Sequence, residues 1–216
     1  MGWANRELDS SKKNSVGYDF LGMQVFTSGT TWTPTSGTRA VFVIVTGGGA
    51  SGGTDASSAG VGGAGGAGAT EMSFLTEKVL VNGTETVTIG SGGGAVSADS
   101  TTGTAGGTSS FGSHVSVPGG AGGITTGQGG AGGIASGSDL NIDGGSGASG
   151  IGITVNTDFQ AANGGCSYWG PGGEGGTEDF TAGKAGDPYG SGGGSPKHNA
   201  TSGAGKSGIC VVYEYG

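Results

Sequence analysis

The chain has 216 residues, of which 57 are glycine and 11% are charged, and its formal net charge is −8. The acidic balance argues against nucleic acid as a partner, because phosphate binding needs a basic surface, and no apolar run approaches the roughly 20 residues of a membrane span. Glycine this abundant without strict Gly-X-Y spacing excludes collagen, and an ordered chain of this composition needs dense backbone hydrogen bonding.

Residues 1–22 differ from the rest, because they are polar and charged and lack glycine runs. They contain no apolar signal core, so we expect no secretory export. We interpret them as a docking arm or linker that precedes a glycine-rich domain over residues 23–216. The alternative for this segment is a loosely held terminus. The expected contact points of the arm are Trp3, Tyr18, Phe20 and Leu21.

Short apolar or alternating runs predict β-strands, and no segment shows the helical period. RAVFVIVT (39–46) and ICVVYEY (209–215) are apolar on both faces, which indicates central strands. Leu140 and Ile142 alternate within DLNID and are expected to point inward. Asn82-Gly83 is a hairpin signal. The expected strands cover residues 24–27, 39–46, 70–75, 78–81, 85–89, 108–117, 139–143 and 209–215.

Between these strands lie glycine-rich excursions, and two of them read Gly-Gly-Ala-Gly-Gly-Ile, over residues 119–124 and 129–134. Every third residue carries a side chain, which fits polyproline II geometry with its three residues per turn. Threads that are bare on two faces can lie side by side and bond through their backbones. The predicted fold is therefore all-β, with a β-sandwich or jelly-roll-like base and an inserted bundle of polyglycine II helices.

Several motifs that suggest chemistry are outweighed by a plainer explanation. ATSGAGKS (200–207) fits a loose phosphate-loop pattern, but a strand follows it where that loop needs a helix. GASGG (49–53) matches a nucleophile elbow, a match expected by chance in this composition. DLNIDG (139–144) copies the first half of a calcium loop, yet Gly150 replaces its bidentate glutamate.

The histidines and cysteines also lack the neighbouring residues that metal binding or catalysis requires. His114 and His198 have no neighbours with metal-ligand spacing. Cys166 and Cys210 are too few for a disulfide framework, so we expect both to be reduced and inert, with Cys210 inside a strand. We therefore predict no catalytic residue, metal or cofactor. The carboxylates that lie closest together in the sequence are Glu174, Glu178 and Asp179, and we interpret them as the solvated face of a loop.

The succession of several pieces resembles a glycine-rich domain of bacteriophage tail fibres and adhesins. These pieces are QVFTSGTTWTPTSGTRAVFVIVTGGGASGG, EKVLVNGTETVTIGSGGG, GGTSSFGS, GSDLNIDGGSG, SYWGPGG and GKSGICVVYEY, and they cover residues 24–216. The chain is also similar to the distal adhesins of T-even-like phages, in which polyglycine II threads carry receptor-binding loops. The resemblance implies a virion fibre component that recognises the bacterial surface. The short N-terminus departs from the large fibres and leaves almost no shaft, so we expect a tip, a small spike or a capsid-borne fibre.

The expected function is attachment of a phage fibre or tail tip to a host-surface receptor, either an outer-membrane protein or a polysaccharide, without enzymatic chemistry. The protein would then reside in the virion, join other fibre or tail proteins through its N-terminus, and form a homotrimer; a monomeric tip on a trimeric shaft is the alternative. Two other functions remain open: a purely structural virion protein, and a polysaccharide-degrading fibre whose acid/base pair comes from the carboxylates above.

Aromatic residues in the glycine-rich loops are the best candidates for receptor contacts, because they supply large contact area at little conformational entropy. The loops expected to touch the receptor are 54–59, 95–102, 151–162, 177–189 and 195–202. For Tyr168 and Trp169, packing over the end of the bundle is an equal alternative. The candidate receptor-binding residues are Phe159, Tyr168, Trp169, Phe180, Tyr189, Lys197 and His198.

Overall fold

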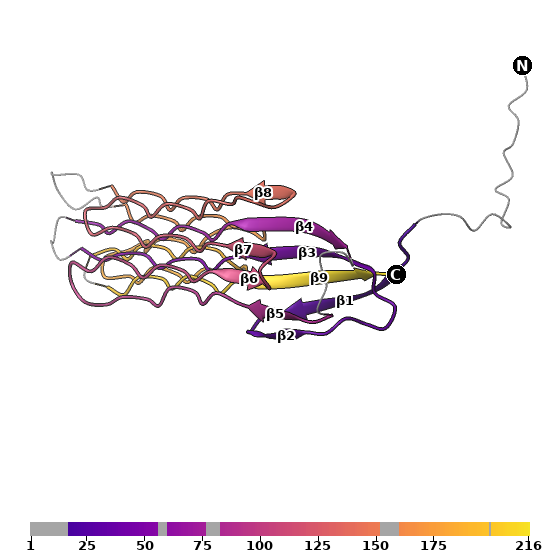
Figure 1. Ribbon diagram of the computed structural model, residues 1–216. Coiled ribbons are helices and arrows are strands. Elements are labelled where there is room, and N and C mark those ends of the chain that lie inside the picture. Colours follow the sequence, from indigo (N-terminus) through magenta and orange to yellow (C-terminus); the bar gives the residue numbers. More distant parts are fainter. Residues whose placement is uncertain (1–16, 56–59, 77–82, 152–159, 199) are drawn as a thin grey trace, which may run out of the picture.

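The computed structural model describes residues 17–55, 60–76, 83–151, 160–198 and 200–216. Within them the chain forms β-strands and glycine-rich threads, with no helix. The strands gather at one end of an elongated molecule, together with the C-terminus, and the threads run side by side to the other end (Figure 1). The predicted all-β fold is confirmed. We call the strand end the base and the opposite end the distal end.

One layer of the base is a five-stranded antiparallel sheet with the order β1-β9-β3-β4-β8. β3 lies between β9 and β4, and β9 lies between β1 and β3, as the two-sided apolar character of both runs predicted. The first and last long strands are thus neighbours. The strands are β1 (Phe20–Phe26), β3 (Ala40–Thr46), β4 (Thr70–Thr76), β8 (Leu140–Ile142) and β9 (Ile209–Tyr215).

The second layer is a four-stranded antiparallel sheet with the order β2-β5-β6-β7. Side chains of both sheets meet in one buried cluster, so the base is a β-sandwich. Trp32 and Phe111 are its largest members, with ring centroids 5.4 Å apart. The strands of this layer are β2 (Thr30–Trp32), β5 (Glu85–Thr88), β6 (Ser109–Phe111) and β7 (Val115–Val117).

Three features of the base differ from the sequence-based expectation. β1 begins at Phe20 instead of residue 24, so Phe20 and Leu21 belong to a strand; Gly22 obscured this because it interrupts the apolar alternation where the pairing with β9 shifts register. β2 was not predicted, because Thr30–Trp32 is too short to show a period. Leu140 is 51% exposed and does not point inward. The expected strand over 78–81 lies outside the described residues.

Two carboxylates are buried in the base, and neighbouring donors satisfy both. Glu214 accepts hydrogen bonds from Gln24 Nε2 (3.1 Å), Trp32 Nε1 (3.2 Å) and the backbone and hydroxyl of Thr35 (3.0 and 2.7 Å). Glu71 accepts from Ser136 N and Ser138 Oγ, each at 2.7 Å. A buried carboxylate needs this satisfaction, because losing its water shell is costly. Glu214 therefore ties both sheets and the turn after β2 together.

Both cysteines are free, and they lie in different surroundings. Cys210 is buried in β9, and burial raises the pKa of its thiol to about 12. Cys166 is exposed. The expectation that Cys210 is an inert strand residue agrees with this burial.

The threads form the predicted polyglycine II bundle, and residues 47–54 are its best example. All eight of these residues are buried. Their amides donate to three neighbouring threads in turn, so that every third amide faces the same neighbour. Their carbonyl oxygens accept from residues of three further segments. The amides of 47–54 donate to carbonyl oxygens in 63–69, 101–107 and 203–206. The carbonyl oxygens of this thread accept from amides of residues 93, 120–123 and 193.

Outer threads show the same period in their burial. Over residues 119–124 and again over 129–134 the pattern is half-buried, buried, exposed for each successive triplet. The exposed positions carry the alanine and isoleucine side chains, and Ile134 is 72% exposed. The bare faces turn inward, where backbone amides bond across threads, as the Gly-Gly-Ala-Gly-Gly-Ile repeats predicted.

Candidate functional site

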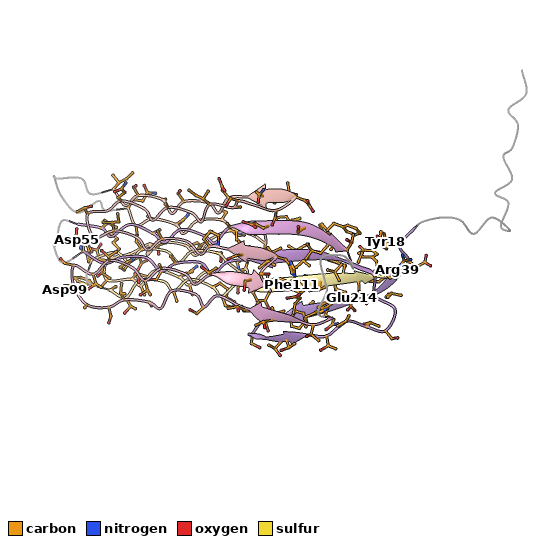
Figure 2. All side chains as sticks on the ribbon, in the orientation of Figure 1. Tyr18, Arg39, Asp55, Asp99, Phe111 and Glu214 are labelled. Atoms are coloured by element: carbon orange, nitrogen blue, oxygen red, sulfur yellow. The ribbon has the colours of Figure 1, made fainter. Side chains whose placement is uncertain are left out.

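The chain alternates between the two ends of the bundle, so successive turns belong to different ends. Turns at 167–170 and 188–190 lie next to the base, because Trp169 and Gly190 adjoin Thr46 at the end of β3. Turns at 98–101 and 177–181 lie at the distal end together with residues 197–198 and 200–201, where Asp55 and Asp99 are labelled in Figure 2. Hydrogen bonds from Val96 to Ser202 and from Lys197 to Thr181 hold these distal turns side by side.

Three of the candidate receptor-binding aromatics lie at the base-proximal turns. Trp169 Nε1 donates to Thr46 Oγ1 at 2.9 Å, and its ring meets Tyr168 edge-on with centroids 5.1 Å apart. Tyr189 is half-buried against an apolar cluster on the five-stranded sheet that includes Ile44. These three side chains pack at the junction of bundle and base, which makes packing the better account of their position.

Three other candidates meet at the distal end, with Asp179 between them. Asp179 Oδ1 lies 3.0 Å from Lys197 Nζ and 3.1 Å from His198 Nε2. The Phe180 ring lies 5.4 Å from the His198 ring and is 74% exposed. We call Asp179, Phe180, Lys197 and His198 the distal cluster. Along the chain, one thread toward the base and one returning thread separate Asp179 and Phe180 from Lys197 and His198, and the structure brings the two pairs together.

Backbone strain is concentrated in the same turns. Among the described residues, the non-glycine positions with positive φ are Ser100 (51°), Phe180 (60°) and His198 (56°), and all three lie in distal turns. A left-handed backbone is unusual for a bulky side chain and persists only where its surroundings enforce it. Phe180 is therefore held outward by a conformation that costs free energy, a pattern that is common at binding sites.

The electrostatics of the distal cluster predict a pH dependence. The hydrogen bond from Lys197, the largest cause, holds the pKa of Asp179 below its ordinary 3.8, although partial desolvation opposes the shift. Because the folded pKa is the lower one, the pairing contributes stability above pH 3.8 and is lost as the pH falls through the folded value. We expect NMR signals of Lys197 and His198 to shift together with the Asp179 carboxyl in acid. Asp179→Asn should abolish that joint shift, and its persistence in the variant would contradict the pairing.

The remaining candidate residues lie elsewhere. Tyr18, Phe20 and Leu21 are at the end of the base, where Tyr18 packs edge-on against Phe74 and Phe20 against Tyr215, with centroids 5.5 and 6.0 Å apart. Phe159 and Trp3 lie outside the described residues. Sequence reasoning grouped Asp179 with solvated carboxylates and missed its place beside Lys197 and His198. Its position next to Phe180 was the available signal.

A depression of about 430 Å³ reaches the distal turn 177–181 and is lined by Gln160, Asn163, Glu174 and Thr177, among others. Glu174 forms an ion pair with Lys184 on an exposed surface, and that contact lowers the pKa of its carboxyl. The lining of the depression therefore offers amide and hydroxyl groups and one paired carboxylate. In the described part of the chain, no three histidine, cysteine or acidic residues gather as metal ligands do.

The fold and these turns define a class: an all-β sandwich that carries a polyglycine II bundle with strained, exposed turns at its far end. A family model described as a glycine-rich domain matches residues 25–215, so the chain belongs to the glycine-rich domain family. A comparison with curated proteins found no match. The described residues contain no helix that is long and apolar enough to cross a membrane.

Proposed function

We propose that this protein is a bacteriophage virion fibre or tail-tip protein that attaches to a host-surface receptor, an outer-membrane protein or a polysaccharide, through its distal turns. The observation that carries the proposal is the distal cluster, in which a strained backbone presents a phenyl ring that is 74% exposed beside His198 and the Asp179–Lys197 ion pair. The resemblance of the sequence to phage adhesins supplies the class of partner.

The bundle suits this role because it is a rigid support for short turns. Each thread is bonded to its neighbours through the backbone, so its side chains are not needed for cohesion. The turns are then free to vary, as binding loops on a rigid scaffold do. An exposed aromatic flanked by charged groups is typical of residues that dominate binding energy.

The base would join the protein to the rest of the virion. Tyr18, Phe20 and Leu21 are 42%, 61% and 39% exposed at the end opposite the distal cluster. With Trp3, they are the proposed contacts to other fibre or tail proteins. We propose a homotrimer in the virion, since three copies bound to one cell surface gain avidity from weak individual contacts.

The proposed attachment involves no enzymatic chemistry. Hydrolysis of a glycoside needs one carboxyl group protonated as the general acid. Glu174 and Asp179 each lie beside a lysine that lowers the carboxyl pKa, so both are ionised at neutral pH. Their arrangement favours charge pairing over acid catalysis.

Purified protein is expected to bind host cells and to block adsorption of the phage, and Phe180→Ala should weaken both effects about 10- to 100-fold, because an exposed aromatic anchor contributes about 1–3 kcal/mol. The matched control is Ile134→Ala, which removes an equally exposed apolar side chain from the side of the bundle. Failure of the wild-type protein to bind cells and to block adsorption would favour a purely structural virion protein. Equal blocking by both variants would show that Phe180 is not a receptor contact, and release of reducing sugar would favour a polysaccharide-degrading fibre.

A further inference from the structure

The two faces of the five-stranded sheet are covered to different extents. The four-stranded sheet covers the inner face of the central strands, where Val41, Val43 and Val212 are fully buried. On the outer face only the part next to the bundle is buried, where Ile44 and Met72 lie under Tyr189. Farther from the bundle and toward both edges, the outer side chains of Met23, Val25, Phe74 and Leu140 are 42–52% exposed.

These exposed side chains form one continuous surface. Strand register places Phe74, Phe42, Tyr213 and Met23 in a single row across β4, β3, β9 and β1. Phe42 and Tyr213 have ring centroids 6.3 Å apart. In the next row toward the bundle only the two ends, Leu140 and Val25, are exposed, because the residues between them on β4, β3 and β9 are buried. Neither row contains a charged residue.

We propose that this outer face packs against two further copies of this chain in the proposed homotrimer. The outer face is defined by Met23, Val25, Phe42, Phe74, Leu140 and Tyr213. The inference rests on the proposed assembly of several copies, and it is independent of attachment at the distal turns.

The size of the outer face supports a lasting contact. Its exposed apolar side chains present on the order of 500 Å², which equals the largest apolar patch of a typical monomer, a patch that is often functional. A standard interface buries about 800 Å² on each partner, so this face would form the apolar centre of such an interface, with a polar rim around it. Tyr18 and Phe20 extend the surface at the end of the base.

The net charge of the chain and the composition of the edge strand β1 indicate that further copies of this chain cover the outer face. The chain carries a net charge of −8, so copies repel one another over most of their surface, and the two uncharged rows are where they approach at the lowest cost. β1 is at the edge of the sheet, and its sequence FLGMQVF has no charged residue or proline to discourage association.

The test is sedimentation of the full chain at micromolar concentrations, read against the monomer mass of 20.3 kDa. The wild type is expected to sediment as a trimer. The double variant Met23→Lys with Val25→Lys should raise the dissociation constant about 100-fold, because both side chains lose apolar burial and bring like charges together. Ile134→Lys makes the same change on the bundle, where the side chain is 72% exposed, and should leave the mass unchanged.

A wild type that stays monomeric over the whole range would overturn the proposal and leave a different virion protein as the occupant of the face. Unaltered association of the double variant would overturn it as well. If the double variant loses cooperative unfolding, Phe74→Ser takes its place and is read in the same way. Phe180→Ala should keep the wild-type mass, so that failure of attachment and failure of self-association are distinguished.

Discussion

Gly49→Ala is expected to lower the free energy of unfolding by about 4 kcal/mol, through overpacking and lost hydrogen bonds in the centre of the bundle. A Cβ atom at Gly49 would overlap the backbone carbonyl of Ser191. The thread cannot shift away, because Gly49 N donates to Lys206 O at 2.8 Å and its carbonyl accepts from Gly93 N at 2.9 Å. Calorimetry or tryptophan fluorescence during denaturation measures the change.

The matched control for this variant is Gly94→Ala, which makes the same chemical change at a site with no atom within 4 Å of the added Cβ. Its effect should stay within about 0.5 kcal/mol, since alanine also restricts the unfolded chain. Equal losses at Gly49 and Gly94 would show that glycine is needed for its flexibility alone, and close contact between threads would no longer explain the composition.

Glu214→Ala is the second variant with a large expected effect, about 3–5 kcal/mol of lost stability, because it removes the acceptor that several buried donors share. Trp32 Nε1 and Gln24 Nε2 would lose their partner inside the sandwich, and the turn at Thr35 would lose its anchor. Denaturation followed by the fluorescence of Trp32 reports the loss.

Glu178→Ala is the control for charge, because it removes one carboxylate from an exposed distal turn. That variant should remain within about 0.5 kcal/mol of the wild type. If Glu214→Ala unfolds at the same denaturant concentration as the control, the carboxylate is not a structural tie between the two sheets.

The bundle and the central strands were predictable from sequence because each rests on a local period. The six residues 119–124 already show the period of three that is typical of polyglycine II threads. β3 and β9 are apolar on both faces, which indicates central strands. β2 and the early start of β1 were missed, since a three-residue strand has no period and Gly22 interrupts the other. These elements depend on partners far away in the chain.

The distal cluster was only partly predictable for the same reason. Phe180, Lys197 and His198 were chosen for residue type and for their glycine-rich surroundings, without any sign that they meet. Tyr168, Trp169 and Tyr189 met the same criteria, yet their turns lie next to the base. Which end a turn occupies depends on counting the outward and returning threads, and that count needs the hydrogen-bonding pattern of the whole bundle.

Along residues 47–54 every third amide donates to the same neighbouring thread. This period restricts how the bundle can change its length during evolution. Inserting one residue would turn every later amide toward the wrong neighbour, whereas inserting three restores the lattice after a single added turn. One triplet in an outgoing thread and one in its returning partner would lengthen that part of the rod by about 9 Å. Growth by triplets would carry the far turns outward while the sandwich that anchors them stays unaltered.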